Sequence, residues 1–465
     1  MPARTNRSEA TAQPRALVQN SLAPGTVDLP SLVPLMYALM SRNIASDGFI
    51  FSDPQAPGDY SKDSKPGCVI AAPSFPADTA GIDEDYVFNW VRDGAITAME
   101  VARADVPART GGLSAQTLND YVQFAELCHS NAQPTKGHAC FTIAGDARPW
   151  TEQNDGPALQ TVTILAAYDQ LDPGIQKTAV ALINANVAFL LDVYREPTTN
   201  LWEEHVGYSF FARAAQLRCF MEVQATRVEG IDKPGGLQAA VDWLRQALDW
   251  HWDGTKYISM VADPGDGSAP SPQHPVVSGY DPNIDIVQAS VYGAVPCTDP
   301  KLLATAAQLR AQWEEGGIAC YPINQTDKRL GIGPLFGRYP GDVYDGDTAH
   351  PVLGGHPWAL STCNGAELHY RLATEIRSSG RVPFDEVSAP FFAQSGISGS
   401  TPAEGAAKAL VATGDAMVRA VVYHSDHFEL SEQFDGTTGY ERSVHNLTWS
   451  YAAYLSAMRA RAAAV

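Results

Sequence analysis

Two adjacent carboxyl groups set among aromatic side chains are the first residues in this sequence that could do chemistry. Glu203 and Glu204 lie between Trp202 and the aromatic run 208–211. Adjacent side chains cannot share one orientation, so we expect the two carboxyls to have different surroundings and different tasks. A carboxyl in an apolar pocket has a raised pKa, as a general acid at neutral pH requires. A charged helix start, favoured by the helix dipole, explains the pair equally well when the segment is taken alone.

Two earlier segments have the same mixed character. In 85–93, Tyr86 and Trp90 offer flat apolar faces that suit a sugar ring. Arg92 and Asp93 follow, and such a pair could form hydrogen bonds to two adjacent hydroxyls. In 150–155, Trp150 stands at the entry of a predicted helix. Each segment alone is also compatible with an ordinary helix cap, an ion pair and core aromatics.

A fourth segment, 431–435, carries Glu432 and is followed by the aromatic stretch 448–451. Glu429, three residues before Glu432, is assigned to solvent. His356 and His445 lie in polar loops and are expected to form hydrogen bonds. The sequence contains no phosphate-binding loop, no nucleophile elbow and no zinc-protease motif. Carboxylates in aromatic loops therefore favour glycoside hydrolysis over other chemistries.

The composition limits the classes of partner. The chain has 465 residues, 45% of them hydrophobic, and a net charge of −20. Such a charge argues against nucleic acid and anionic membrane surfaces, and no apolar run of ~18 residues suggests a membrane span. The first thirty residues lack an apolar signal region, and the seven cysteines show no metal-binding spacing. We expect a cytoplasmic protein, or a secreted one if a leader was removed, without cofactor or metal. The sequence leaves the oligomeric state open.

The elements that must position these residues are mostly helices. Residues 1–28 are predicted to be a flexible tail and 29–465 one catalytic domain, with a helical pattern from Leu29 and a long ordered loop over 49–85 that includes a short strand at 68–71. About a dozen further helical patterns follow. They lie near 93–104, 114–130, 157–171, 175–194, 208–225, 235–250, 284–293, 299–315, 357–374, 383–394, 404–422 and 447–463. Asp155 is predicted to cap the helix that Pro157 begins. An even number near twelve suggests six hairpins closing a ring, although periodicity alone also allows another large helical fold.

Taken together, these segments resemble glycoside hydrolase family 15, the glucoamylase family. The resemblance covers roughly residues 30–463 in the family's order. It rests on 88–93 (FNWVRD), 153–159 (QNDGPAL), 201–204 (LWEE) with Gly207 and 210–211, 337–344 (GRYPGDVY) with 356–358 (HPW), and 431–435 (SEQFD) with 447–453 (LTWSYAA).

The resemblance implies a mainly α (α/α)6 barrel of about twelve helices, in which long ordered loops form an active-site funnel. It implies Glu203 as general acid and Glu432 as general base. Residues implied to bind an oligosaccharide or glucan are Tyr86, Trp90, Arg92, Asp93, Trp150, Trp202, Glu204, Arg338 and Trp358. Among these, Arg92 and Asp93 would hold the terminal glucose, and Arg338 would bind across the cleaved bond.

The implied reaction is exo-acting, inverting hydrolysis of α-1,4-linked maltooligosaccharides, which releases β-D-glucose from non-reducing ends. An inverting pair keeps its carboxyls ~6.5–9.5 Å apart to admit the attacking water. The same residues would serve α-1,6-linked glucans or trehalose, and a catalytically silent sugar-binding barrel is a further alternative. A metal-dependent helical-barrel enzyme would need a richer acidic motif than Asp83-Glu84-Asp85.

Three departures from the family pattern concern the outer part of the site. Trp150 is followed by Thr-Glu-Gln, which shortens the loop by one residue and removes a basic residue. A longer stretch fills 345–357, and Val444-His445-Asn446 stands where Ala-Arg-Asp is common. The first two changes put chain-length and linkage preference in doubt, whereas the predicted acid and base are untouched.

Overall fold

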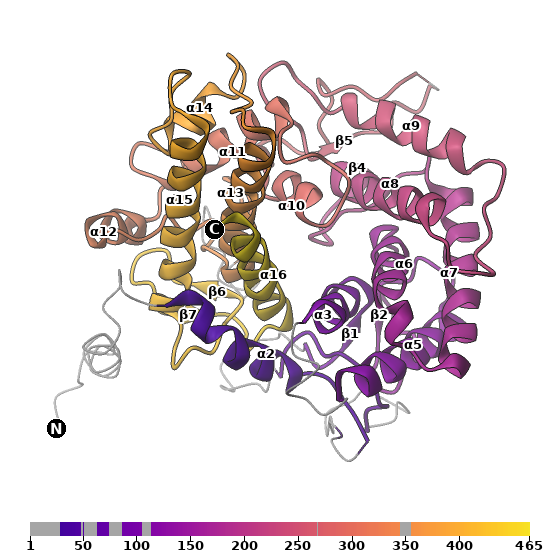
Figure 1. Cartoon of the computed structure of the whole chain (residues 1–465). Helices are drawn as coiled ribbons and strands as arrows, with labels where there is room; N and C mark the ends of the chain where they lie inside the picture. The colour runs from indigo at the N-terminus through magenta and orange to yellow at the C-terminus, as the bar shows by residue number, and fades with distance from the viewer. Residues whose placement is uncertain are drawn as a thin grey trace.

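Six inner helices form a closed ring at the centre of the molecule. The computed structural model describes residues 28–47, 50, 63–73, 86–104, 113–266, 268–344 and 355–465, so residues 1–27 of the predicted tail, most of the 49–85 loop and the stretch 345–354 lie outside it. Each inner helix contacts the next around the ring, and the last contacts the first (Figure 1). In ring order they are α3 (Val91–Arg103), α6 (Asp155–Ala167), α8 (Phe210–Ala225), α10 (Asp285–Val291), α13 (Ala359–Ser379) and α16 (Thr448–Ala464).

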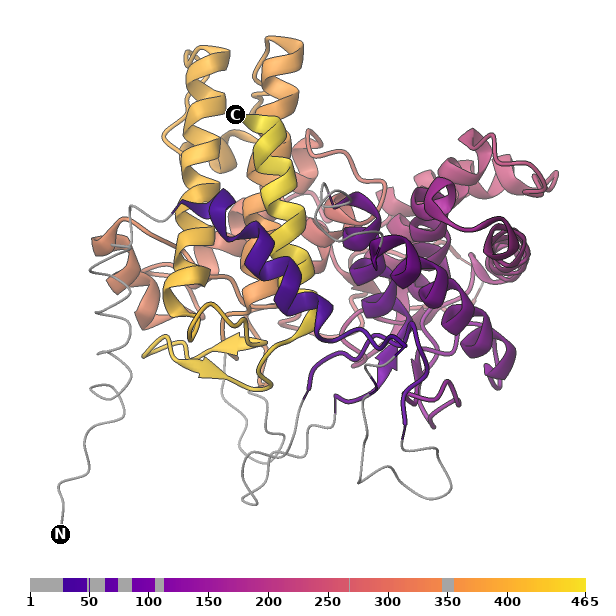
Figure 2. The same ribbon diagram turned by 60° about the horizontal axis from the view of Figure 1, so that its bottom comes forward.

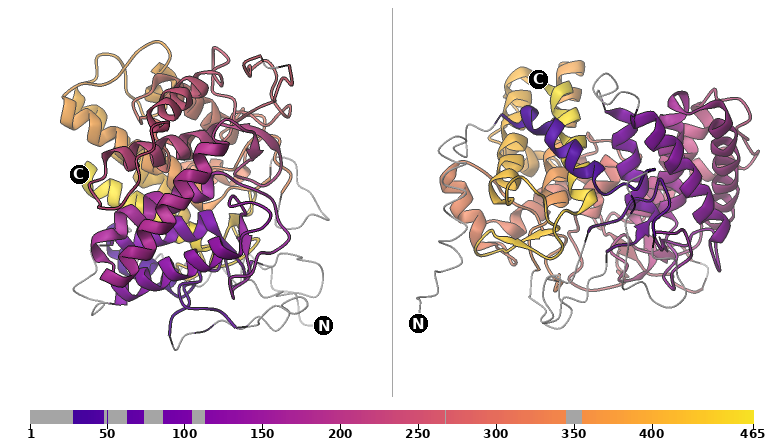
Figure 3. Two further views of the ribbon diagram at one scale, coloured as in Figure 1. Left: turned by 90° about the vertical axis from the view of Figure 1, so that its right-hand side faces the viewer. Right: turned by 90° about the horizontal axis from the view of Figure 1, so that it is seen from below.

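A second layer of six helices covers the ring from outside, one against each inner helix. In the same order they are α5 (Leu113–Asn131), α7 (Pro173–Val193), α9 (Leu237–Asp249), α11 (Pro300–Trp313), α15 (Ala403–His424) and α2 (Val33–Ser41). The predicted ring of helical hairpins is thus an (α/α)6 barrel. Figure 3 shows the same two layers from the side and from below.

The twelve barrel helices correspond to the twelve expected patterns except for one helix. The early segment α2 packs on α16 and completes the outer layer, as Figure 2 shows. The pattern at 383–394 gives only α14 (Ala389–Ala393), which contacts α11 outside the ring. Asp385 and Ser388 bond to each other's backbone N–H groups and hold a turn where a helix was expected. Helix α12 (Pro322–Leu330) was not predicted, and the single-turn helices η1 (Leu29–Leu32) and η2 (Tyr168–Gln170) flank α2 and α6.

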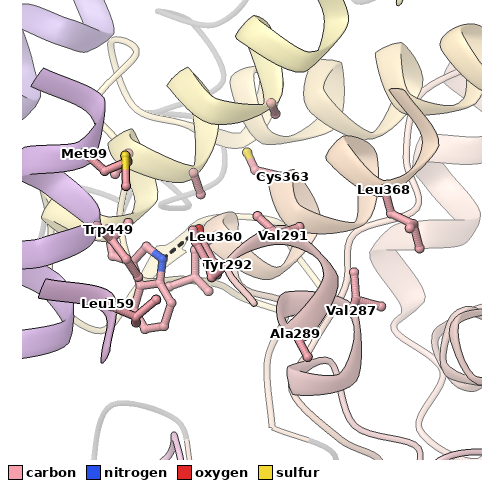
Figure 4. Close-up of a cluster of buried hydrophobic side chains, with 14 of the residues drawn as sticks. Met99, Leu159, Val287, Ala289, Val291, Tyr292, Leu360, Cys363, Leu368 and Trp449 are labelled. Carbon is pink, nitrogen blue, oxygen red and sulfur yellow. Dashed lines mark hydrogen bonds between the residues drawn. The ribbon is translucent and has the colours of Figure 1, made fainter. Parts of the chain in front are cut away.

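Burial explains the two layers. Inner helices such as α6 are buried around nearly their whole circumference, and small residues such as Gly156 and Ala158 allow neighbouring backbones to approach. Outer helices bury one stripe, as α9 does with Leu237, Val241 and Leu244. Near the axis the Trp449 Nε1 donates to the Tyr292 hydroxyl at 3.0 Å and joins α16 to the end of α10 (Figure 4).

Helix α7 also meets the length and hydropathy expected of a membrane span, with a mean hydropathy of 1.3 over its most apolar window. In the fold it contacts α5 and α6, and Ala179, Ile183 and Val187 lie on its buried stripe. That one-sided burial is what an outer barrel helix requires.

Three small antiparallel sheets occupy connections between the helices. Strand β1 (Asn89–Trp90) pairs with β2 (Cys140–Phe141), β4 (Val206–Ser209) lies between β3 (Thr198–Thr199) and β5 (Met260–Val261), and β6 (Gln433–Phe434) pairs with β7 (Glu441–Arg442). The predicted strand at 68–71 is only an isolated bridge between Val69 and Ile44. Figure 2 shows β6 and β7 at the end of the barrel where α16 begins.

Candidate active site

A cavity of about 350 Å³ lies among the loops that lead into the inner helices. All eleven residues singled out from the sequence line it: Tyr86, Trp90, Arg92, Asp93, Trp150, Trp202, Glu203, Glu204, Arg338, Trp358 and Glu432. Seven residues that were not assigned to the site line it too: Ala71, Arg148, Leu201, Tyr344, Leu360, Leu447 and Trp449. The fold thus brings together segments from five separate loops.

Glu203 has the surroundings of a carboxyl that keeps its proton. It lies in the turn between β3 and β4 at a positive φ of 64°, a conformation uncommon outside glycine. Its Oε2 accepts a 2.8 Å hydrogen bond from the Trp150 indole, and its Oε1 has no hydrogen-bond partner among the described residues. Burial raises the pKa of Glu203 to about 7; Arg92 and the Trp150 bond oppose the rise, and Asp93 adds to it.

Glu204 has opposite surroundings, although it is the next residue. Its carboxylate accepts a 3.0 Å bond from the Arg338 guanidinium. The hydroxyls of Tyr339 and Tyr280 donate to it at 2.9 Å. The Glu204 carboxylate is therefore engaged by three donors. The expectation that the two neighbours have different environments is confirmed.

A buried charged cluster closes one side of the cavity at the start of α3. Arg92 lies 3.2 Å from Asp155 and 3.7 Å from Asp93. Burial raises the pKa of Asp93 to about 6, and the Arg92 charge limits that rise. The predicted capping role of Asp155 is wrong: α6 begins at Asp155 itself, after Asn154. The Asp155 carboxylate is used instead to pair with Arg92.

Glu432 lies just before β6 and is held through both its backbone and its side chain. Its N–H donates to the Val444 carbonyl at 2.9 Å, and its own carbonyl accepts from Ala359 at the start of α13. The Tyr86 hydroxyl donates to Oε1 at 3.2 Å, and the Ser443 hydroxyl donates to Oε2. Two hydroxyl donors on one buried carboxyl stabilise its charged form.

The polar residues near Glu432 behave largely as the sequence indicated. Glu429 is outside the cavity, with 39% of its side chain exposed, in a 3.1 Å ion pair with Arg42. His356 accepts a hydrogen bond from the Gly436 N–H. His445 lies 3.1 Å from Glu441. No group of potential metal ligands occurs within the described part of the chain.

Aromatic rings form two groups on the cavity wall. Tyr86, Trp90 and Trp150 follow one another in edge-to-face contacts, with ring centroids 5.7 and 5.9 Å apart. Trp202 and Trp358 form the other group at 5.6 Å. The Arg338 guanidinium lies over both of the latter rings, at 5.1 and 5.2 Å. These flat apolar faces suit the C–H faces of a sugar ring.

Three of the residues that the sequence analysis did not assign to the site show why such residues were missed. Trp449 stands in a segment that was quoted but assigned no role. Ser443 reaches Glu432 only because β7 folds back on β6, which no local pattern signals. Arg148 precedes Trp150 by two residues in an irregular loop, and its guanidinium carbon lies 4.4 Å from the centroid of the Trp150 ring. No periodic pattern marks such a loop, so the sequence carries no signal for Arg148.

The arrangement can bind an uncharged polyhydroxyl ring and exchange protons with it. The pKa of one carboxyl is raised to about 7, two hydroxyls donate to the other, and both carboxyls line one aromatic cavity. A charged pair such as Arg92 and Asp93 can form hydrogen bonds to two neighbouring hydroxyls of the ring.

Comparisons with known proteins agree with this chemistry. The sequence model of the family described as "Glycosyl hydrolases family 15" matches residues 55–459. A relative named "Glucoamylase", from Blastobotrys adeninivorans, is 27% identical over 90% of this chain and 70% of its own length. A "Probable glucoamylase" from Schizosaccharomyces pombe is 26% identical, over 87% of both chains. A solved glucoamylase structure from Saccharomycopsis fibuligera shares the fold, with a TM-score of 0.75 at 21% identity over 94% of this chain and 96% of its own.

Proposed function

Because the chain belongs to glycosyl hydrolases family 15, we propose that it is an exo-acting, inverting glucoamylase that removes β-D-glucose from the non-reducing ends of α-1,4-linked maltooligosaccharides. The coarse activity, glycoside hydrolysis of a glucan by a glucoamylase-type enzyme, follows from the family and from relatives named glucoamylase. The stereochemistry, the linkage and the roles of individual residues are the finer parts of the proposal.

The observation that carries the proposal is the unequal state of Glu203 and Glu432 within one cavity. Glu203, with a pKa raised to about 7, is protonated in a large fraction of the molecules at neutral pH and donates that proton to the glycosidic oxygen as the bond breaks. Glu432, whose anion is stabilised by Tyr86 and Ser443, accepts a proton from the attacking water. Water then adds from the opposite face, and the anomeric configuration inverts.

The other cavity residues position the substrate. Arg92 and Asp93 form the closed end, where they would bind the hydroxyls of the terminal glucose and exclude longer non-reducing extensions. Glu204 and Arg338 form a 3.0 Å ion pair whose remaining donors and acceptors would hold the sugar across the cleaved bond. The two aromatic groups complete the walls.

Anomer-resolved proton NMR on maltose, isomaltose, trehalose and maltotriose tests the proposal directly. We expect β-glucose as the first product, with maltotriose and maltose cleaved faster than the other two. Initial release of α-glucose would overturn the inverting mechanism. Faster cleavage of isomaltose or trehalose would keep the mechanism and replace the linkage. The expected carboxyl separation of ~6.5–9.5 Å is checked in a crystal structure with bound glucose.

A further inference from the structure

Arg148 is a wall residue of the cavity to which the proposed reaction gives no task. It lies in the loop between β2 and α6, and it lines the cavity together with Trp150 and Glu203. Its guanidinium carbon is 4.0 Å from the centroid of the Phe88 ring and 4.4 Å from that of Trp150. The guanidinium is thus stacked between two rings, which fixes its plane and leaves its N–H groups at the edge.

The charge of Arg148 is not neutralised in the way that the charges of its neighbours are. Arg92 pairs with Asp155 and Asp93, and Arg338 pairs with Asp342 and Glu204. Arg148 has no carboxylate partner in the described part of the chain. Its guanidinium forms a hydrogen bond with the thiol of Cys140, a weak acceptor. Several guanidinium donors of Arg148 therefore remain available to a ligand.

The position of Arg148 indicates which part of a substrate it would meet. Arg92 and Arg338 are only 6% and 4% exposed, deep in the cavity. Arg148 is half-buried, and Trp150, on which it stacks, is 39% exposed, so this pair lies at the rim. If the enzyme is exo-acting as proposed, the terminal glucose occupies the closed end, and the rim meets the sugars beyond the cleaved bond.

We propose that Arg148 is a substrate-binding residue for the leaving-group side, donating hydrogen bonds from its stacked edge to hydroxyls of the sugar units beyond the terminal glucose. Trp150 offers the adjoining apolar face. This inference rests on the proposed function and adds to it a determinant of chain-length preference.

The test compares Arg148→Met with the wild type on three substrates. α-Glucosyl fluoride has no sugar on the leaving-group side, maltose has one, and maltotetraose has three. We expect kcat/KM for α-glucosyl fluoride to stay unchanged and kcat/KM for maltotetraose to fall about tenfold, as for one lost charged hydrogen bond. Arg148→Lys, which keeps the charge without the planar edge, should recover part of the loss.

A matched control is Arg195→Met, which removes another ring-stacked arginine. Arg195 stacks on Tyr194 and Trp243, just beyond α7, and does not line the cavity. This variant should hydrolyse all three substrates like the wild type.

The pH–rate profile on maltotetraose separates direct binding from an indirect effect on the acid. Burial, Arg92, Trp150, Asp93 and Trp90 set the pKa of Glu203. Loss of a substrate contact leaves the alkaline limb in place while the rate falls. A shifted alkaline limb would show that Arg148 acts through Trp150 and Glu203, and an equal loss on α-glucosyl fluoride would show general distortion; either result overturns the proposal. If the wild type hydrolyses none of the three substrates, the proposed function itself fails.

Discussion

The two sides of the cavity hold the same functional group in opposite surroundings. On the α8 side, Glu203 has 19% of its side chain exposed, has one oxygen without a hydrogen-bond partner among the described residues, and lies close enough to Asp93 for that carboxyl to raise its pKa. On the α16 side, Glu432 is as little as 3% exposed, yet hydroxyl groups donate to both of its oxygens. Glu432 is the more deeply buried of the two, so depth of burial does not by itself separate the proposed acid from the proposed base.

The supply of hydrogen-bond donors makes the difference. A buried carboxyl with few donors is more stable when protonated, whereas one that accepts several hydrogen bonds is more stable as an anion. An acid and a base can therefore be built from one residue type by changing its neighbours. Glu204, one residue away from the proposed acid, shows the same contrast, since three donors surround its carboxylate.

Replacing each carboxyl by its amide tests the comparison with the largest effects. Glu203→Gln and Glu432→Gln should each lower kcat on maltotriose by about 10³-fold, since each removes a proton-transfer group. On α-glucosyl fluoride the two should separate: fluoride leaves without needing a proton, so Glu203→Gln keeps far more activity than Glu432→Gln. Glucose release is measured, with circular dichroism to check the fold. Equal behaviour on the fluoride would contradict the assignment of acid and base.

Asp93→Asn changes the charge beside Glu203 and should have the next largest effect. Loss of a buried carboxylate proposed to bind the terminal sugar should lower kcat/KM for maltose by about 30- to 100-fold. Because Asp93 helps to raise the pKa of Glu203, its removal lowers that pKa and moves the alkaline limb to lower pH. An alkaline limb that stays in place or moves upward would show that Asp93 does not act on the acid.

Ser443→Ala should alter the Glu432 side by a smaller amount. The variant removes the hydroxyl that donates to Oε2 and leaves the Tyr86 donor in place. The anion loses stabilisation, so a proton binds more readily, and the acid limb of the pH–rate profile moves to higher pH by about 0.5–1 pH unit. The alkaline limb should not move, because Ser443 does not contact Glu203. An unchanged acid limb would mean that Ser443 does not tune the base.

The sequence was most informative where function depends on local composition. The place of Glu203 and Glu432 in the cavity could be predicted because each stands in a short segment that matches the family's pattern. The helices were also predictable from local sequence, since the periodic pattern of apolar residues that predicts a helix lies within ten to twenty consecutive residues.

Contacts between segments that lie far apart in the sequence were not predictable. Ser443 reaches Glu432 through the pairing of two-residue strands, which carry no periodicity of their own. Helix α2 joins α16 across almost the whole chain, so its place in the ring could not be read from its spacing. The partner of Asp155 depends on where α3 and α6 meet, and a local rule for caps therefore gave the wrong role.

Trp150→Phe should give the smallest effect and sharpens the comparison most directly, because it removes the hydrogen bond that the Trp150 indole donates to Glu203. The phenyl ring keeps the stacking partner of Arg148 but lacks the N–H that donates to Oε2 at 2.8 Å. That bond lowers the pKa of Glu203, so its loss raises the pKa above about 7. The acid then keeps its proton to higher pH, and the alkaline limb moves upward by about 0.5 pH unit, less than for a fully buried bond because Trp150 is partly exposed. The acid limb, set on the other side of the cavity, should not move. A downward shift of the alkaline limb would mean that donor supply does not control the acid, and the contrast between the two sides would then need another cause.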